Sequence, residues 1–267
     1  KLSKNKLYIV STPIGNLEDI TLRALDVLKN SEIILCEDTR RSIKLLNHFK
    51  IQTKLISYHK FNEKKKLIEV IQYIKQGKIL SLISDAGTPL LSDPGRILIN
   101  ECVKKDINVI PIPGVSSITT AMSVSGFKDQ FLFYGFLPKK KNELNKILES
   151  LSSIDCTQVF FIPAVKINFY LNIFKDYFNN RKVMIAKEMT KIHEVFYRKS
   201  ISNLSNLKIP EKGELTIVLS EKISQKKLID KDKIINKAKK FLKKYSLKDT
   251  VDLIMETEQI KKKDIYK

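Results

Sequence analysis

Hydrophobic and polar positions follow two different patterns over the first 130 residues. Short, nearly continuous apolar runs have the length of buried strands, and they span 7–10, 33–36, 79–83 and 107–110, with a shorter strand at 55–57. Between them, apolar residues recur at helical spacing in 21–30, 41–49, 64–76 and 96–105. Strands that alternate with helices in this order predict βαβ units, and therefore an α/β fold with a mostly parallel sheet.

A second α/β unit is predicted from the apolar segment that begins at Phe131. Its expected elements are a charged helix at 139–150, a strand at 157–162, a helix at 165–178 and strands near 182–186, 194–198 and 214–219. Gly135 and Pro138 precede three consecutive lysines, so we place the hinge between the two units near 135–141. The predicted domains are 1–135 and 136–221.

The last segment, 222–267, is predicted to be a basic helical tail. From residue 221 to the end the chain holds 15 Lys against 8 Asp and Glu, with no Gly or Pro. Apolar residues repeat at helical spacing from Ile234 to Tyr245, which predicts a helix over 231–245, followed by helices at 248–257 and 260–266. Two such helices are compatible with a helix-turn-helix-like unit, and also with a tail that packs on the body or stays solvated.

The composition indicates a globular protein, with 43% hydrophobic residues among 267. No apolar run approaches the ~20 residues of a membrane span, and no apolar signal core follows the basic N-terminus, so we expect no membrane association. The three cysteines are widely spaced, which suits a reducing compartment and gives no cluster with metal-ligand spacing. We therefore expect a cytoplasmic protein without a bound metal.

The net charge of +20 leaves two interpretations open. A strongly basic protein is suited to a nucleic-acid partner, because its charges neutralise phosphates. The basic residues are 43 Lys but only 6 Arg, a bias that A/T-rich coding also produces without any selection for binding.

Glycine and proline are concentrated in three short loops. Seven of the 8 Gly and six of the 8 Pro precede residue 139, and most lie in loops at 11–16, 84–95 and 111–117, each directly after an apolar run. Glycine lets the backbone turn sharply and approach a ligand closely. Because ligands of open α/β sheets bind beyond the carboxyl ends of the strands, these loops predict a small-molecule site. The alternative is that they are ordinary strand-to-helix turns.

The loops contain none of the common nucleotide-binding or hydrolase motifs, neither G-x-G-x-x-G, nor a P-loop, nor G-x-S-x-G. Instead, LYIVSTPIGNLEDITLRAL, CEDTRRS, YHKFNE, SDAGTPLLSDPG and PIPGVSSITTAMSVSG follow one another in this order. This series resembles the tetrapyrrole-methylase-type family of S-adenosylmethionine-dependent methyltransferases. Within the family it is similar to the bacterial branch that methylates the 2′-hydroxyl of a cytidine in 16S ribosomal RNA.

The resemblance implies a two-domain class III methyltransferase fold, with S-adenosylmethionine in the cleft between the domains. It also implies a homodimer that acts on the decoding region of 16S rRNA in the small ribosomal subunit. The alternatives are a small-molecule methylase of the tetrapyrrole type and a non-catalytic RNA-binding relative. The amino-acid sequence of the loops disfavours a tetrapyrrole methylase, and the intact cofactor loops disfavour a non-catalytic relative.

The family's cofactor loops match residues in all three glycine-bearing loops, and Gly213 matches a glycine at the border of the cleft. The matched loop residues are Pro13, Ile14, Gly15, Asp85, Ala86, Gly87, Thr88, Ser116 and Ser117. We expect Gly15 and Gly87 to let the backbone reach the cofactor, and the Asp85 carboxylate to accept its hydrogen bonds. The alternative for Asp85 is a turn cap that binds the backbone of the same loop.

Substrate contacts are predicted on the motifs that follow the second and third strands. Arg40 and Arg41 are a third of the arginines of the chain, and a planar guanidinium suits a bidentate phosphate contact. The alternative is a local ion pair at a helix N-terminus. The match at His59 and Asn62 adds Asn62 to the predicted RNA contacts, whereas His59 could also be a loop residue bonded to backbone.

Methyl transfer to a ribose hydroxyl needs a proton acceptor, and four residues are candidates. They are Asp38, His59, Glu188 and Lys191, of which the last requires a lowered pKa. The chain departs from the family where Ile162, Val165 and Lys166 replace a typical Glu, His and Arg, and Lys187 replaces an Arg. These departures put a substrate contact by the 161–166 loop in doubt.

Overall fold

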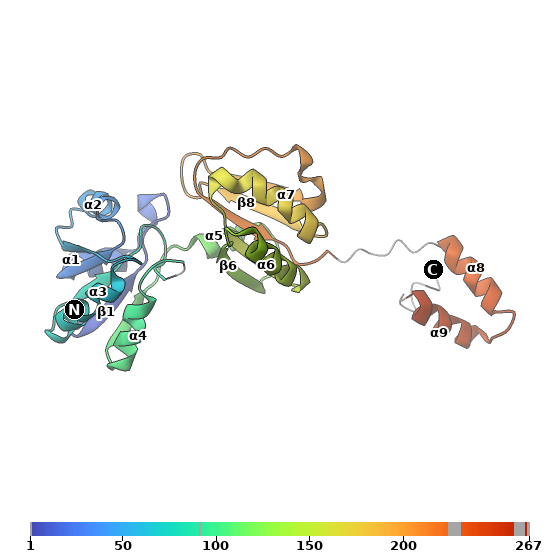
Figure 1. Cartoon of the computed structure of the whole chain (residues 1–267), viewed down its shortest axis with the longest axis horizontal. Helices are drawn as coiled ribbons and strands as arrows, with labels where there is room; N and C mark the ends of the chain where they lie inside the picture. Colours follow the sequence, from blue (N-terminus) through green and yellow to red (C-terminus); the bar gives the residue numbers. More distant parts are fainter. Residues whose placement is uncertain (1, 91, 224–230, 259–264, 266–267) are drawn as a thin grey trace. The chain divides into compact units, whose positions relative to one another are not determined.

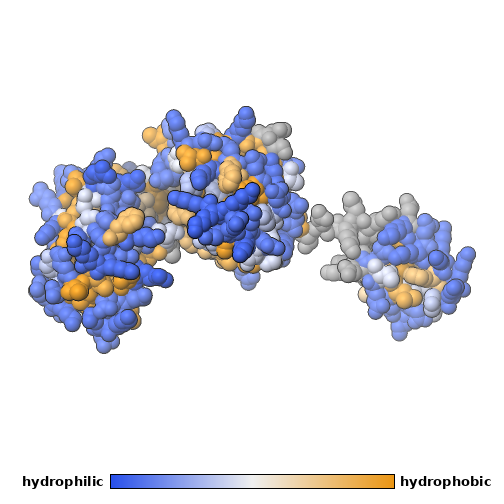
Figure 2. All heavy atoms as spheres, viewed as in Figure 1, coloured by the Kyte–Doolittle hydropathy of each residue, from blue (hydrophilic) through white to orange (hydrophobic). Residues whose placement is uncertain are grey.

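A computed structural model describes residues 2–90, 92–223, 231–258 and 265 of the chain (Figure 1). The chain divides into two compact units, Lys1–Ile223 and Ser224–Lys267. The first unit contains two five-stranded sheets, and the second contains two helices. Polar and charged side chains cover most of the face shown in Figure 2, with smaller apolar patches between them.

The first sheet is entirely parallel, as the alternating pattern predicts. Its strands have the order β3-β2-β4-β1-β5. They are β1 (Lys6–Val10), β2 (Ile33–Cys36), β3 (Lys54–Ser57), β4 (Leu80–Leu82) and β5 (Asn108–Ile112). Successive residues of a strand point to opposite faces, so Leu7 packs in one apolar cluster and Tyr8 in another.

Helices cover both faces of this sheet, which explains why the central strands β1, β2 and β4 are buried on both sides. α1 (Leu22–Asn30) and α2 (Thr39–His48) contribute to the cluster around Tyr8 and Val10. α3 (Glu63–Lys75) and α4 (Arg96–Lys104) contribute to the cluster around Leu7 and Ile9. All four helices lie within a few residues of the ranges that the hydrophobic periodicity predicts.

The second sheet is mixed, with the order β6-β7-β10-β8-β9. Its strands are β6 (Phe131–Phe136), β7 (Thr157–Phe161), β8 (Lys182–Lys187), β9 (Val195–Ser200) and β10 (Leu215–Leu219). β6 and β7 are parallel, whereas the other neighbours are antiparallel. α6 (Lys141–Ser153) and α7 (Ile167–Phe178) pack on one face in the largest apolar cluster.

α5 (Ser117–Ser125) is a helix that the hydrophobic pattern does not predict. It follows β5 of the first sheet, and Ile118 and Ala121 pack against Val159 and Val218 on the second face of the second sheet (Figure 1). Serine and threonine dominate its sequence, and these residues favour turns and caps over helix interiors. Burial against the second sheet stabilises a helix that the local propensity leaves weak.

Three short 3₁₀ segments complete the first unit: η1 (Leu17–Asp19), η2 (Ala164–Lys166) and η3 (Ile201–Asn206). The predicted domain boundaries at 135 and 221 stay predictions. β6, which spans the first of them, pairs with the second sheet. In the part of the chain that the structure describes, no helix is long and apolar enough to cross a membrane.

The second unit holds α8 (Lys231–Phe241) and α9 (Leu247–Glu258). The predicted helix over 231–245 therefore ends four residues early, and the Ser246 hydroxyl accepts from the Asp249 backbone at the start of α9. Lys233 and Lys237 both bind the Glu258 carboxylate. The third predicted helix, 260–266, lies outside the described residues except at position 265.

Candidate functional site

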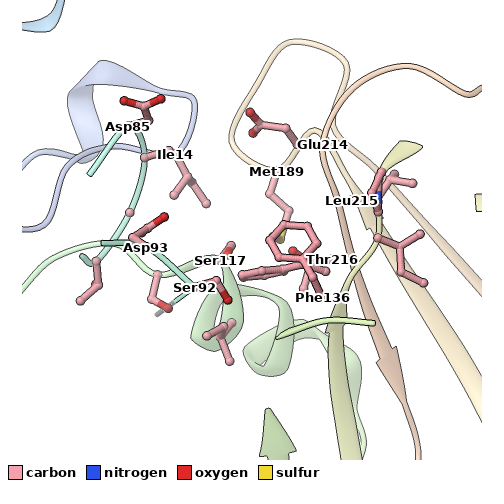
Figure 3. A pocket seen from close by; sticks show the side chains of 18 of the residues that line it. Ile14, Asp85, Ser92, Asp93, Ser117, Phe136, Met189, Glu214, Leu215 and Thr216 are labelled. Atoms are coloured by element: carbon pink, nitrogen blue, oxygen red, sulfur yellow. The ribbon is translucent and has the colours of Figure 1, made fainter. Parts of the chain in front are cut away.

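A cavity of about 390 Å³ lies at the carboxyl edge of the first sheet, where loops from both sheets meet (Figure 3). Figure 3 shows Asp85, Asp93 and Ser117 on one side, facing Met189 and Glu214 on the other. Eight of the ten predicted cofactor residues line the cavity: Ile14, Asp85, Ala86, Gly87, Thr88, Ser116, Ser117 and Gly213. Pro13 and Gly15 line an adjoining pocket of about 250 Å³.

Hydrogen bonds tie the three glycine-bearing loops to one another. Thr12 and Gly87 exchange two backbone hydrogen bonds of 2.9 Å. The Thr88 hydroxyl lies 3.0 Å from the Ser11 hydroxyl and donates to the Val115 carbonyl at 3.0 Å. Because the parallel strands β1, β4 and β5 end at the same edge, their loops form one connected wall.

Two glycines of this wall make room for protein neighbours. Gly87 has φ +78°, and a Cβ there would lie 3.3 Å from the Ile14 side chain. A Cβ on Gly15 would lie 2.5 Å from Cγ of Lys191 and 2.7 Å from the Thr190 hydroxyl. Gly15 therefore lets the first loop lie directly against the loop that follows β8. Contacts with other parts of the protein therefore explain why glycine is needed at both positions. The expected approach of their backbones to a cofactor stays a prediction.

Three carboxylates, Glu37, Asp85 and Asp93, form an acidic part of the wall. Oδ1 of Asp85 accepts from the Asp38 backbone N–H at 3.0 Å, so Asp85 connects the loops after β2 and β4 rather than capping its own turn. Burial and then the nearby Asp85 charge raise the pKa of Glu37. Burial and then the Glu37 charge raise the pKa of Asp93 to about 6.

Glu37 and Asp93 are site residues that the sequence assignment missed. Both belong to motifs that carry the resemblance, Glu37 to CEDTRRS and Asp93 to the second half of SDAGTPLLSDPG. Glu37 directly follows the end of β2, and Asp93 follows the glycine-bearing segment after β4. These two positions in the sequence could have indicated that both residues belong to the site. What the motif does not reveal is that the second half of the long loop turns back to the cavity.

We predict that Asp93→Asn stabilises the protein at pH 7. The pKa of Asp93 in the fold, about 6, lies above the value of about 3.9 expected in the unfolded chain. Its contribution to stability is therefore complete below about pH 4 and is lost as the pH rises through about 6. The neutral amide removes the cost of a buried charge, so the melting temperature at pH 7 should rise by about 2–4 °C. Between pH 4 and 7 the variant should show a flatter dependence than the parent in thermal melts, and parallel curves would contradict the assignment.

Asp38 and Arg40 form a local ion pair outside the cavity. Asp38 caps α2 by accepting from the Arg40 backbone at 2.9 Å, and its two oxygens accept from Nε and Nη2 of Arg40 at 3.2 and 3.0 Å. These hydrogen bonds lower the pKa of Asp38. The Arg40 side chain is 87% exposed. Of the two predicted arginines only Arg41 lines the cavity, with Nη1 at 3.7 Å from Oδ2 of Asp85.

His59 and Asn62 shape the loop that connects β3 to α3. The Asn62 side chain accepts from the His59 backbone at 2.8 Å and donates to the Ser57 carbonyl at 3.1 Å. Nδ1 of His59 accepts from the Phe61 backbone at 3.3 Å. Neither residue lines the cavity, so the structure gives both a part in holding the loop, and their predicted functional roles stay predictions.

Glu188 and Lys191 connect the loop after β8 to the segment before β10. The Glu188 carboxylate accepts from the Glu214 backbone at 2.7 Å, which lowers its pKa, and from Nζ of Lys191 at 3.2 Å. Nζ of Lys191 also lies 3.0 Å from the Glu214 carboxylate. Although burial opposes it, these two acidic partners raise the pKa of Lys191. A protonated lysine donates and does not accept a proton, which disfavours Lys191 as the base.

The wall from the second sheet is mainly apolar. Phe136, Phe161, Ile162, Met189 and Leu215 line it, and Ile162 is only 2% exposed. Val165 and Lys166 do not line the cavity. The departure at Ile162 therefore makes this wall less polar. Among the described residues no group of His, Cys, Asp and Glu could hold a metal ion.

Comparisons with known proteins agree with this fold. The family model for Tetrapyrrole (Corrin/Porphyrin) Methylases matches residues 6–205. Ribosomal RNA small subunit methyltransferase I of Mesomycoplasma conjunctivae is 48% identical over 85% of this chain and 95% of its own. The protein of the same name from Rickettsia prowazekii is 42% identical over 98% of this chain and 93% of its own.

Solved structures with the same fold have much lower identity. Diphthine synthase superimposes with a TM-score of 0.63 at 13% identity, over 80% of this chain and 89% of its own. Uroporphyrin-III C-methyl transferase from Thermus thermophilus, complexed with S-adenosyl homocysteine, gives 0.58 at 14% identity, over 81% of this chain and 97% of its own. The predicted two-sheet α/β fold is confirmed.

Proposed function

We infer the reaction from the fact that this chain belongs to the tetrapyrrole (corrin/porphyrin) methylase family, whose model matches residues 6–205. We propose that it is an S-adenosylmethionine-dependent methyltransferase whose substrate is 16S rRNA of the small ribosomal subunit. The proposed acceptor is the 2′-hydroxyl of a cytidine ribose in the decoding region. The observation that carries the proposal is the convergence of the three family loops on one cavity, in a chain 40–48% identical to relatives named ribosomal RNA small subunit methyltransferase I.

The residues present suit a cationic, partly apolar cofactor. S-adenosylmethionine supplies a methyl group on a sulfonium and also carries an ammonium, and both positive charges are stabilised by carboxylates. Glu37, Asp85 and Asp93 provide that charge, while Ile14 and Met189 provide apolar surface. The proposed cofactor contacts are the predicted loop residues together with these carboxylates.

The protein's contribution to the reaction is orientation and proton transfer. A ribose hydroxyl is a weak nucleophile while protonated, so an acceptor near the cavity lowers the barrier. Glu37 and Asp93 line the cavity with raised pKa values, which makes each a stronger base than an ordinary carboxylate. We add these two to the proposed acceptors Asp38, His59 and Glu188.

RNA contacts are proposed for Arg40, Arg41 and Asn62, of which Arg41 reaches the cavity and its neighbouring pocket. The net charge of +20 supports a polyanionic substrate. A homodimer and a cytoplasmic location are also proposals, which rest on the family resemblance and on the ribosomal substrate.

The direct test is methyl transfer from labelled S-adenosylmethionine to isolated small ribosomal subunits that lack the modification. We expect label in 16S rRNA at one nucleotide that resists alkaline hydrolysis at its 3′ side, because a 2′-O-methyl group blocks that cleavage. Label on a base, or transfer only to a tetrapyrrole, would contradict the proposal. Cofactor-free binding of subunits without any transfer would support a non-catalytic relative.

Removal of the basic tail is expected to weaken rRNA binding, because lysines that bind phosphates are removed with it. Each such lysine contributes about one unit to the slope of log K against log salt, so its removal should make the slope shallower by that amount. The sequence places four lysines on one side of the predicted helix over 231–245, namely Lys233, Lys237, Lys240 and Lys244. Lys233 and Lys237 already bind Glu258, whereas Lys240 and Lys244 are exposed, so we expect this side to contribute about one to two units rather than four. Subunit binding at three salt concentrations, for the full chain and a chain ending at residue 222, measures this change.

Cofactor affinity serves as the control, since the cavity lies wholly within residues 14–216. It should be equal in both chains. An unchanged salt slope would show that the lysines of the tail are solvated and do not contact RNA.

A further inference from the structure

The loop that connects β3 to α3 is hydrogen-bonded to two segments that carry cavity residues. At its start, the Tyr58 backbone donates to the Cys36 carbonyl at 2.7 Å, next to the cavity residue Glu37. At its end, the buried Glu63 carboxylate accepts from the Gly95 backbone at 3.2 Å, two residues beyond the cavity residue Asp93. The loop is therefore part of the rim of the proposed active site.

Phe61 is at the tip of this loop with its side chain 95% exposed. The loop beneath it is well fixed, because the His59 carbonyl accepts from the backbones of Asn62 and Glu63, both at 2.9 Å. The Phe61 backbone donates to Nδ1 of His59, and the two rings lie edge to face with centroids 6.1 Å apart. An ordered loop thus holds a large aromatic ring almost entirely in solvent, with the His59 ring at its edge.

Three exposed lysines surround this ring in the sequence: Lys60, Lys64 and Lys65. Within the described part of the chain none of them forms an ion pair, although other lysines on this molecule do, such as Lys105 with Glu101. An exposed aromatic side chain among unpaired cations is the combination that binds single-stranded nucleic acid, since bases stack on the ring and phosphates bind the cations.

We propose that Phe61, with Lys60, Lys64 and Lys65, forms a docking surface for single-stranded RNA beside the cavity. In this surface the Phe61 ring stacks on a base that flanks the methylated nucleotide, and the lysines bind its phosphates. The inference rests on the proposed function, because it takes the RNA substrate as given and adds how a neighbouring nucleotide is held. It also accounts for the position of YHKFNE at the same sheet edge as the cofactor loops.

Charge decides between RNA and a second copy of the chain as the occupant. A two-fold contact centred on Phe61 would place the same patch on both partners, so the lysines around one Phe61 would lie close to those around the other. Like charges at such short range repel one another, whereas a phosphate backbone brings the opposite charge. The surface therefore favours RNA.

The test compares Phe61→Ala, Phe61→Leu and Phe61→Trp in the full chain, with Phe169→Ala as the matched control. Phe169 is 54% exposed on α7 and is not a cavity residue. Loss of one base-stacking contact should raise the Kd for a fluorescent single-stranded RNA oligonucleotide about 5- to 100-fold. We expect this for Phe61→Ala and, in large part, for Phe61→Leu, which keeps an apolar side chain without a ring. Phe61→Trp should retain the affinity of the parent chain, and Phe169→Ala should change nothing.

Kinetic and cofactor measurements separate docking from chemistry and from misfolding. With small ribosomal subunits, Phe61→Ala should raise KM and leave kcat at saturation, the melting temperature and the Kd for S-adenosylmethionine unchanged. An oligonucleotide with an abasic site beside the target should bind the parent chain as weakly as the intact oligonucleotide binds Phe61→Ala.

Two outcomes would overturn the proposal. One is an oligonucleotide Kd and a subunit KM for Phe61→Ala that equal those of the parent chain. The other is a change of oligomeric state in Phe61→Ala by light scattering, which would identify a second copy as the occupant. If the parent chain transfers no methyl group to RNA, the proposed function fails, whereas the oligonucleotide binding series still decides the role of Phe61.

Discussion

Gly87→Val is expected to lower the affinity for S-adenosylmethionine at least about 100-fold, equivalent to about 2.7 kcal/mol. Gly87 has φ +78°, a conformation that a β-branched residue adopts only with strain. Its Cβ would also press on the Ile14 side chain at 3.3 Å and approach the Val115 carbonyl at 3.6 Å. Relief of these contacts requires the loop around Asp85 to move, and Asp85, Ala86 and Thr88 of that loop line the cavity. Isothermal titration measures the change.

Gly126→Val is the matched control for this variant. Gly126 also has positive φ, +70°, but a Cβ there has no heavy atom within 4 Å, and it ends α5 at the opposite end from Ser117. It should therefore reproduce the cost in thermal stability and leave the cofactor affinity within about twofold. Equal losses of affinity in both variants would show that global strain, not the cofactor loop, determines binding.

The first sheet and its site loops were predictable because the relevant physics is local. Continuous apolar runs identify β1 to β5, a period of 3.6 residues identifies the helices between them, and parallel strands necessarily end at one edge. Glycine and proline then mark the loops, so the sequence alone assigns Ile14, Gly87 and Ser116 to one site. Asp93 was missed because its position depends on how the long loop after β4 returns to the cavity.

Of the opposite wall, the sequence assigned only Gly213, because segments far apart in the chain build that wall. The Asn16 backbone donates to the Thr190 hydroxyl at 3.0 Å, a contact across 174 positions of sequence. Glu188 and Lys191 were predicted near the chemistry, but the contacts that hold them, to the backbone and carboxylate of Glu214, appear only in the folded chain. α5 was missed for the same reason, since its partner is a sheet formed later in the sequence.

Scarcity of arginine was a useful signal that was applied to too few positions. In a chain with 43 Lys and 6 Arg, each arginine suggests a need for a planar group with several donors. Arg40 and Arg41 were assigned to RNA contacts on this basis, and in the structure Arg40 forms an ion pair with Asp38 at the surface. The arginine with the strictest geometric demand is Arg181, which is 1% exposed.

Arg181→Lys is expected to reduce the free energy of unfolding by about 3 kcal/mol. Nη1 of Arg181 donates to the carbonyls of Cys156 at 2.8 Å and Ser220 at 2.7 Å, and Nη2 donates to the Ile154 carbonyl. The guanidinium thereby joins the end of α6 to the ends of β7 and β10. An ammonium group lacks the spread of donors to reach all three, so at least one buried carbonyl loses its partner. Urea unfolding of both chains, monitored by circular dichroism, gives the difference.

Arg40→Lys provides the comparison that makes this result informative. The same chemical change at an 87% exposed side chain should alter the free energy of unfolding by no more than about 0.5 kcal/mol. Water can replace the hydrogen bonds that the guanidinium makes to Asp38. The same variant tests the proposed phosphate contact, since loss of a bidentate contact to RNA should lower methylation of small subunits without any cost in stability. If Arg181→Lys lowers the free energy of unfolding by less than about 1 kcal/mol, a lysine ammonium group satisfies the three carbonyls nearly as well as the guanidinium does. In that event the fold would not require arginine at position 181, and a need for arginine over lysine would remain only at a position that contacts RNA.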